Sequence, residues 1–252
     1  MTNRIASGNR ISSAADDAAG LSIATHLNAN ARSMDQAVRN GQDGISMVQV
    51  AEGGMNTTSS ILIRLRELAI QCSSDTIGDK ERSFVNKEVF QLRDEIDRIS
   101  KSTEFNGKKL LTGSFSWPNL EVQVGINSEH DESRLDLNRN GMNISLGQLG
   151  LTTIDFSTKE MAREHLGAID DALQVVSRNR AYLGATMNRL QSAISNDQTY
   201  SENTKSAKSR IQDTDMATEA AEATKIQILS DATISVLSQA NQNQNLALKL
   251  LS

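Results

Sequence analysis

Small and apolar residues recur every three or four positions along three stretches of this chain, which is the pattern of a helix that buries one narrow face. The first stretch, 24–55, is interrupted by Glu52, and the third, 162–194, by Arg180; the second covers 85–99. The predicted buried positions are Ala24, Leu27, Ala31, Met34, Val38, Gly41, Ile45, Val48 and Met55, then Val85, Val89, Leu92, Ile96 and Ile99, then Ala162, Leu166, Ile169, Leu173, Val176, Leu183, Met187, Leu190 and Ile194. Because the opposite faces are polar, we expect these helices to pack on one another.

The middle of the chain changes to a period of two. Apolar residues alternate with polar ones at Leu120, Val122, Val124 and Ile126, and again at Leu135 and Leu137. This alternation predicts a β-hairpin or small sheet between the second and third helical stretches. Ahead of it, Phe105-Asn106-Gly107 is a turn signal, and Pro118 disfavours a helix through Ser116 and Trp117.

Composition favours a thin helical assembly over one thick core. The 252 residues include one Trp, two Tyr, five Phe and one Pro, so large residues that fill a globular interior are scarce, whereas paired helices need only small and aliphatic side chains. We therefore predict a mainly α fold: an elongated antiparallel helical bundle or coiled-coil rod with a small β-hairpin region.

Charge and hydropathy exclude several classes of function. The net charge is −5, and the 26 Lys and Arg residues are scattered among 31 Asp and Glu residues, which argues against nucleic-acid binding. No stretch reaches the roughly 18 apolar residues of a membrane span, and the N-terminus does not have the pattern of a secretory signal. Cys72 has no second cysteine to pair with and is expected to be a small buried residue.

Candidate metal and catalytic motifs are weak. Asp136-x-Asn138-x-Asn140-Gly141 opens like a calcium loop, but position twelve is Gly147 where a bidentate Glu is needed. The cluster Glu129-His130-Asp131-Glu132 has no second spaced His, and His26, His130 and His165 form no HExxH pattern. We predict no enzyme activity, no metal site and no cofactor.

The C-terminal stretch from 220 to 251 has apolar residues on more than one helical face. They are Ile226, Ile228, Leu229, Ile234, Val236, Leu237 and Leu250. A helix that is apolar on several sides is buried by neighbours, or left unpaired when it has none. This tail is therefore expected to be covered by a partner.

Ordered motifs at both ends of the chain resemble bacterial flagellins. The N-terminal motifs are 10–21 (RISSAADDAAGL), 40–46 (NGQDGIS), 64–69 (RLRELA), 94–99 (DEIDRI) and 105–107 (FNG). The C-terminal ones are 210–217 (RIQDTDMA), 239–242 (QANQ) and 246–251 (LALKLL). The resemblance covers roughly three quarters of the chain and leaves 120–150 without strong motifs. It implies a minimal flagellin without outer surface domains.

The resemblance implies a structural subunit that polymerises with other copies into the flagellar filament for motility and leaves the cell by the flagellar type III route. It also implies a rod domain over 1–205, with helices at about 5–103, a β region at about 105–150 and a long helix at about 158–205. The remainder, 206–252, would be the C-terminal half of the inner domain. Flagellins usually have a further helical segment before a Ser-Gly-x-Arg-Ile motif, which this chain reaches at Ser7, so we expect that segment to be missing.

Two further partners are implied by the resemblance alone. An export chaperone would wrap the C-terminal segment, with Ile226, Leu229, Ile234, Val236, Leu237 and Leu250 as its packing residues. Arg64, Leu68 and Glu88 match flagellin positions that contact Toll-like receptor 5, although Ile63 stands where receptor-activating members have glutamine. The plainer interpretation is an exposed Arg64/Glu67 pair that contributes to filament contacts.

Two other functions stay open at the level of the sequence. A hook–filament junction protein resembles flagellin at its ends and differs in the middle. A helical adaptor that does not polymerise would have similar seams, and it would stay monomeric under conditions where a filament subunit assembles.

Overall fold

The computed structural model describes residues 2–113, 120–128, 133–137 and 142–251, with side chains described from 3 to 240 within these ranges. The chain divides into two compact units: Ser33–Thr199, and Met1–Arg32 together with Tyr200–Ser252. Each unit is described by itself below.

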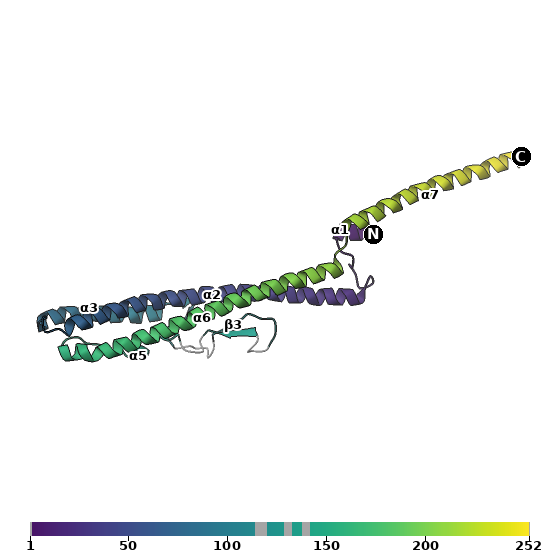
Figure 1. The fold of residues 1–252 in the computed structure, drawn as a ribbon. Coiled ribbons are helices and arrows are strands. Elements are labelled where there is room, and N and C mark those ends of the chain that lie inside the picture. The colour runs from purple at the N-terminus through teal and green to yellow at the C-terminus, as the bar shows by residue number, and fades with distance from the viewer. Residues whose placement is uncertain (1, 114–119, 129–132, 138–141, 252) are drawn as a thin grey trace. The chain divides into compact units, whose positions relative to one another are not determined.

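The unit 33–199 is built on three long helices, α2 (Ala18–Cys72), α3 (Asp79–Ser102) and α6 (Lys159–Gln212), of which α2 and α6 continue into the other unit. Figure 1 shows α2 and α6 side by side. They run antiparallel, since Arg66 Nε donates to the Asp170 carboxylate at 2.7 Å while Glu52 faces Arg180 further along. The predicted mainly α fold with antiparallel helices is confirmed.

The three seams also lie where the sequence predicts them. Every predicted seam position is buried or half-buried, and Val48, Met55, Val89, Ile96, Ile169, Val176, Leu183 and Leu190 are at most 1 % exposed. Complete burial of one Val, Leu or Ile side chain stabilises a fold by about 1.5–3 kcal/mol relative to exposure. These seams therefore supply the main apolar contacts of the unit.

Two glycines of α2 let neighbouring elements approach closely. A Cβ atom at Gly41 would lie 2.8 Å from Ile194 of α6, and one at Gly44 would lie 3.1 Å from Val122. Glycine weakens a helix, but at these two positions it is needed because a larger residue would not leave room for α6 and the β region.

The β region consists of two small antiparallel pairs. β1 (Glu104–Phe105) pairs with β2 (Lys108–Lys109) around a two-residue turn in which Asn106 and Gly107 have φ of 48° and 75°, as a type I′ hairpin requires. β3 (Glu121–Gln123) pairs with β4 (Arg134–Asp136), with Val122 opposite Leu135. The predicted turn and hairpin are confirmed.

One position of the alternation was predicted wrongly. Leu120, Val122, Val124, Leu135 and Leu137 are buried, but Ile126 is 40 % exposed. The strand ends at Gln123 and Gly125 follows, so the alternation no longer fixes which side a residue faces. The expectations for Ser116, Trp117 and Pro118 lie outside the described residues.

A buried asparagine fixes the segment between the short helix α5 (Leu146–Leu149) and α6. The Asn86 amide of α3 donates to Asp155 at 2.8 Å and to the Ser157 hydroxyl at 3.0 Å, and its oxygen accepts the Phe156 N–H at 2.9 Å. Phe156 is completely buried. A polar group inside a core needs such complete pairing.

The second unit contains α1 (Thr2–Ser7), the ends of α2 and α6, and α7 (Met216–Leu251). The Arg10 N–H donates to the Gln212 carbonyl at 2.6 Å and the Thr214 N–H donates to the Gly8 carbonyl at 3.0 Å. Arg4 forms an ion pair with the largely buried Glu219 at 3.5 Å. The N-terminal residues thereby hold the connection between α6 and α7.

The helix boundaries differ from the expected ones at two places. Residues 8–17 are not helical, although helices were expected from about residue 5, because the Asp16 carboxylate accepts the N–H groups of Ser12 and Ser13 in a turn. Asp17 then caps α2 by accepting the Gly20 N–H at 2.9 Å. The long helix expected to end at about 205 runs to Gln212.

Candidate functional site

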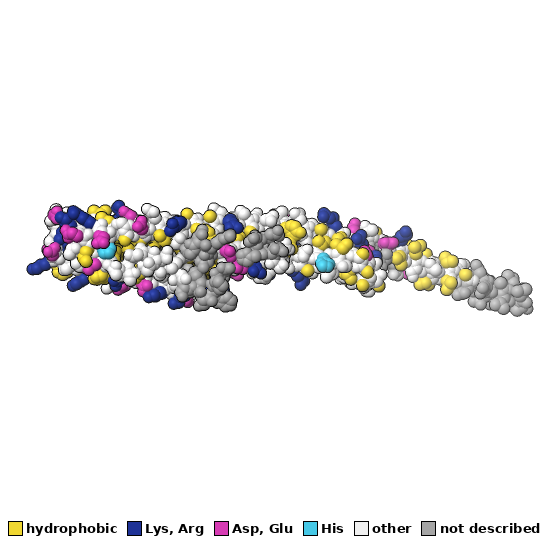
Figure 2. All heavy atoms as spheres, turned by 90° about the horizontal axis from the view of Figure 1, so that it is seen from below, with side chains coloured by type: hydrophobic (Ala, Val, Ile, Leu, Met, Phe, Trp, Pro, Cys, Tyr) yellow, Lys and Arg dark blue, Asp and Glu magenta, His cyan; other side chains and the backbone are white. Residues whose placement is uncertain are grey.

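The most exposed apolar surface in the described chain lies on α7. Six large apolar side chains among its described residues are more than half exposed: Ile226 (51 %), Ile228 (63 %), Leu229 (56 %), Ile234 (65 %), Val236 (68 %) and Leu237 (64 %). Figure 2 shows hydrophobic side chains along this part of the surface. At 100° per residue these positions point to all sides of the helix, so one flat partner surface cannot cover them. The Leu250 side chain lies outside the described ones.

The first turn of α7 is capped. Asp215 accepts the Ala217 and Thr218 N–H groups at 2.9 and 3.4 Å and the Thr218 hydroxyl at 3.0 Å. These hydrogen bonds lower the pKa of Asp215 below its ordinary value, and the one from the Thr218 hydroxyl has the largest effect on that pKa. The helix therefore has a defined start although its sides are exposed.

The second candidate surface lies between α2 and α3. Arg64 Nε donates to Glu88 at 3.0 Å and its Nη1 lies 3.1 Å from Glu67, while all three side chains stay 43 to 61 % exposed. The hydrogen bond that Arg64 donates to Glu88, followed by the one that it donates to Glu67, raises the pKa of Arg64. The structure thus brings Arg64 and Glu88 together, and it forms the Arg64/Glu67 pair as well.

Leu68 differs from the sequence expectation of a contact patch that includes its side chain. Leu68 is 1 % exposed and belongs to the core between the helices. Arg64 and Leu68 are one turn apart, but the Arg64 side chain is exposed and pairs with Glu88 of α3, whereas the Leu68 side chain is buried. Leu68 is therefore a core residue in this conformation and is not part of the exposed surface.

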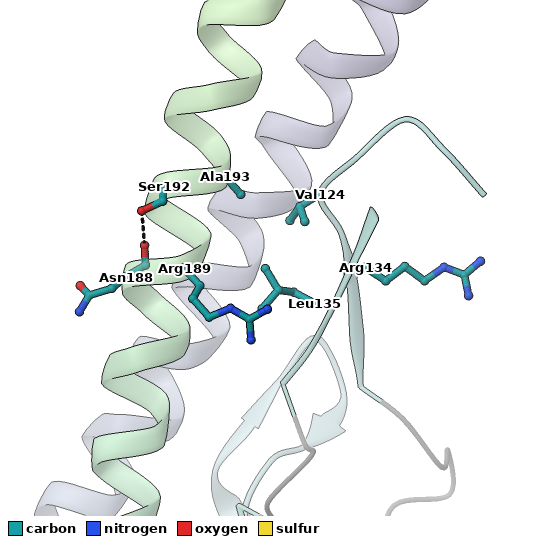
Figure 3. A pocket seen from close by; sticks show the side chains of 7 residues that line it. All are labelled: Val124, Arg134, Leu135, Asn188, Arg189, Ser192 and Ala193. Carbon is teal, nitrogen blue, oxygen red and sulfur yellow. Dashed lines mark hydrogen bonds between the residues drawn. The ribbon is translucent and has the colours of Figure 1, made fainter. Parts of the chain in front are cut away.

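A shallow hollow of about 390 Å³ lies between α6 and β3–β4, lined by Val124, Arg134, Leu135, Asn188, Arg189, Ser192 and Ala193. Figure 3 shows Arg189 reaching toward Leu135, whereas Arg134 extends away from the hollow. The Ser192 hydroxyl donates to the Asn188 carbonyl within its own helix. The lining residues include no carboxylate, thiol or imidazole that would serve as a general base or nucleophile.

The described residues contain no group of three or more His, Cys, Asp or Glu side chains placed to hold a metal ion. Asp136 lies in β4, whereas Asn138, Asn140 and the cluster 129–132 lie outside the described residues. Cys72 is completely buried, as predicted, and burial raises the pKa of its thiol, which makes it a poor nucleophile. Among the described residues, no helix is both long and apolar enough to span a membrane.

Comparisons with known proteins decide between the open interpretations. Residues 1–116 match the bacterial flagellin N-terminal helical region, and residues 166–251 match the bacterial flagellin C-terminal helical region. A flagellin of Halalkalibacterium halodurans is 43 % identical over 248 residues, which cover 98 % of this chain and 89 % of that protein. The chain belongs to the bacterial flagellin family.

Other relatives agree. A flagellin of Bacillus subtilis is 38 % identical over 275 residues, covering 98 % of this chain and 90 % of that protein. The crystal structure of Bacillus cereus flagellin matches 63 % of this flagellin and 88 % of its own chain at 27 % identity, with a TM-score of 0.55.

The fold is shared with a second kind of flagellar protein. A putative flagellar hook-associated protein of Vibrio parahaemolyticus matches 79 % of this flagellin and all of its own chain, with a TM-score of 0.63 but 15 % identity. That identity shows a common fold alone. The identity to flagellins therefore decides against the junction-protein and adaptor alternatives.

This flagellin is thus a structural subunit of the flagellar filament, exported from the cell, and it is not an enzyme. The predicted family, fold class and function are confirmed. Sequence patterns did not reveal that Glu52 and Arg180, the interruptions of two seams, are partners of each other at 3.8 Å. The sequence did contain an indication of this pairing: each residue is the single charged interruption of its seam, and the two charges are opposite.

Proposed function

We propose that α7 forms the inner contact layer of the filament and that an export chaperone covers it before assembly. The observation that carries the proposal is the exposure of large apolar side chains on all sides of one helix: Ile226, Ile228, Leu229, Ile234, Val236 and Leu237. Burial of each such side chain contributes about 1.5–3 kcal/mol. Packing of several partner helices around α7 would therefore bury these side chains and stabilise the assembly far more than α7 stabilises a single chain.

We assign different structural roles to the two domains whose bounds the family resemblance implies. Residues 1–205 supply the rod that carries lateral contacts, and 206–252 supply the inner domain. Assembly of this kind is heterologous: each copy offers one surface to the next and the contacts do not close, so a tube grows.

The test uses α7 variants and a matched control. The chain, alone and with a flagellin-type N-terminal helical segment fused before Met1, is seeded with short filament fragments and viewed by electron microscopy. Replacing Leu229 and Leu237 by Ser should abolish filament growth and weaken binding of the export chaperone by at least tenfold. Thr233→Ser, a polar change on the same helix, is the control, and growth of the double variant at the parent rate would refute the proposal.

A second candidate function is recognition by Toll-like receptor 5 through Arg64 and Glu88. It rests on the family resemblance, and the exposed ion pair between these side chains supports it. An arginine that is held in place by a carboxylate loses little entropy when a partner binds it. Leu68 has no exposed side chain to offer a receptor and is a core residue of α2.

Signalling in cells that carry the receptor tests this function. Arg64→Ala and Glu88→Ala should each lower the potency of the protein by about five- to thirtyfold, the cost of losing an interface anchor. Arg98→Ala, which removes a similar exposed ion pair with Glu95 at another place on α3, should change nothing. Ile63→Gln, which restores the residue of receptor-activating members, should raise potency. Equal signalling by Arg64→Ala and Arg98→Ala would remove the assignment.

A further inference from the structure

The two charged residues that interrupt facing seams meet at one level of the α2/α6 pair. Arg180 Nη2 lies 3.8 Å from Glu52 Oε1, and the two side chains are 36 and 38 % exposed. Arg180 Nε is buried without a hydrogen-bond partner among the described atoms. A half-exposed and loosely spaced ion pair stabilises a fold much less than the apolar contact that the seam would otherwise make there.

Helical glycines flank both charged residues. Gly53 follows Glu52 directly, and Gly184 lies one turn after Arg180. A Cβ atom at either glycine would meet nothing within 4 Å, whereas one at Gly41, Gly44 or Gly54 would press against Ile194, Val122 or Leu111. Close packing therefore explains the latter three glycines but neither Gly53 nor Gly184.

A glycine in a helix interior weakens the helix because the unfolded backbone has more freedom to lose. Near this level each helix has a glycine that weakens it, and the two seams are interrupted by a half-exposed ion pair. Four residues make up this place: the ion pair Glu52 and Arg180, and the glycines Gly53 and Gly184. We refer to them as the interrupted level.

We propose that the interrupted level is a flexible joint at which the α2/α6 pair of one subunit bends. The seams on both sides of it stay closed because their apolar contacts are complete. The bend changes the curvature of the unit 33–199 without unfolding it. A filament subunit with such a joint fits neighbours at slightly different spacings, as subunits on the inside and outside of a curved tube must.

Amide hydrogen exchange of the full chain, followed peptide by peptide, tests the joint. In the parent protein, amides of 53–58 and 181–188 should exchange at least about tenfold faster than those of 62–69 and 169–176, because they open locally. Gly53→Ala with Gly184→Ala should slow exchange at the joint by about five- to twentyfold and leave the flanking segments unchanged, as expected from helix propensity.

Gly167→Ala is the matched control, because a Cβ atom at Gly167 also meets nothing within 4 Å and the seam beside it is uninterrupted. It should leave exchange at 53–58 unchanged. A second route to the same result is Glu52→Leu with Arg180→Leu, which completes both seams and should also slow exchange at the joint. Equal protection of joint and flanks in the parent, or uniform slowing along the whole chain in the double alanine variant, would overturn the proposal.

Discussion

At the scale of single residues, the neighbouring glycines Gly53 and Gly54 of α2 show how position decides the effect of one methyl group. A Cβ atom at Gly54 would lie 2.8 Å from Leu111 and 2.9 Å from Thr103, and Leu111 is completely buried. Gly54→Ala should therefore lower the free energy of unfolding by about 1–3 kcal/mol through overpacking. Gly53→Ala should raise it by up to about 1 kcal/mol through helix propensity.

Urea denaturation of both variants checks this opposition in sign. The two changes are chemically identical and adjacent, so each is the control for the other. Destabilisation by both would show that α2 needs a glycine at 53 for a reason beyond the contacts described here.

A second residue-scale prediction concerns Asp155, which stabilises the segment before α6. Hydrogen bonds, first from the Ser157 side chain and also from its N–H and from Asn86, lower the pKa of Asp155 below its ordinary value of 3.8, although partial burial acts the other way. Because the folded pKa is depressed, the ionised carboxylate stabilises the fold at pH values above 3.8. This contribution is lost as the pH falls through the lower folded value.

Thermal unfolding of the parent and of Asp155→Asn between pH 7 and pH 2.5 measures this contribution. The parent should be the more stable protein from pH 7 down to about pH 4.5, and the difference should shrink toward zero below that. A difference that is constant over the whole range would mean that the carboxylate charge has no part in holding the segment.

At the scale of elements, Leu68 of α2 lies in the buried core, whereas the Arg64–Glu88 pair that joins α2 to α3 is exposed. Leu68→Ala removes a side chain that is 1 % exposed and should cost about 2–5 kcal/mol of unfolding free energy. Arg64→Ala removes an exposed ion pair and should change the unfolding free energy far less, because solvent screens such pairs.

Chemical denaturation separates these two effects, and receptor assays should be interpreted accordingly. A loss of signalling in Leu68→Ala has to be compared with its loss of stability, whereas a loss in Arg64→Ala reports the surface. Similar stability of Leu68→Ala and the parent would show that the core repacks readily around the smaller side chain.

At the scale of the whole molecule, the apolar residues of the chain have two different uses. Those of the seams are buried within the chain, and those of α7 are exposed. Replacing Leu229 and Leu237 by Ser should therefore leave the urea midpoint of the unassembled chain unchanged. Leu190→Ser, at a completely buried seam position, should lower the unfolding free energy by about 2–5 kcal/mol.

Circular dichroism during a urea titration measures the stability of both variants. The cooperative unfolding transition that it follows is that of unit 33–199. Destabilisation by the α7 double variant equal to that of Leu190→Ser would show that α7 is packed in the unassembled chain. That result would also remove the basis for assigning its surface to filament assembly.

The sequence by itself determined the helices, the seam positions and the family. It also determined the turn of the first hairpin, β1–β2, and the alternation of apolar residues in the second, β3–β4. Each of these depends on short-range periodicity or on local motifs: the spacing of three and four that places Val48 and Leu190 inside, or the Asn106-Gly107 pair that suits a tight turn. The domain boundary at 205/206 stays a prediction.

Only the tertiary structure decided which residues meet across elements. Periodicity says that a residue lies on a face but not what lies opposite, so it did not pair Glu52 with Arg180, place Leu68 in the core, or expose Ile126. The same limit applies to glycine, since a helix pattern treats Gly53 and Gly54 alike while the packing of Leu111 and Thr103 distinguishes them. Contacts between residues far apart in the chain depend on register, and register is fixed only when the helices pack together.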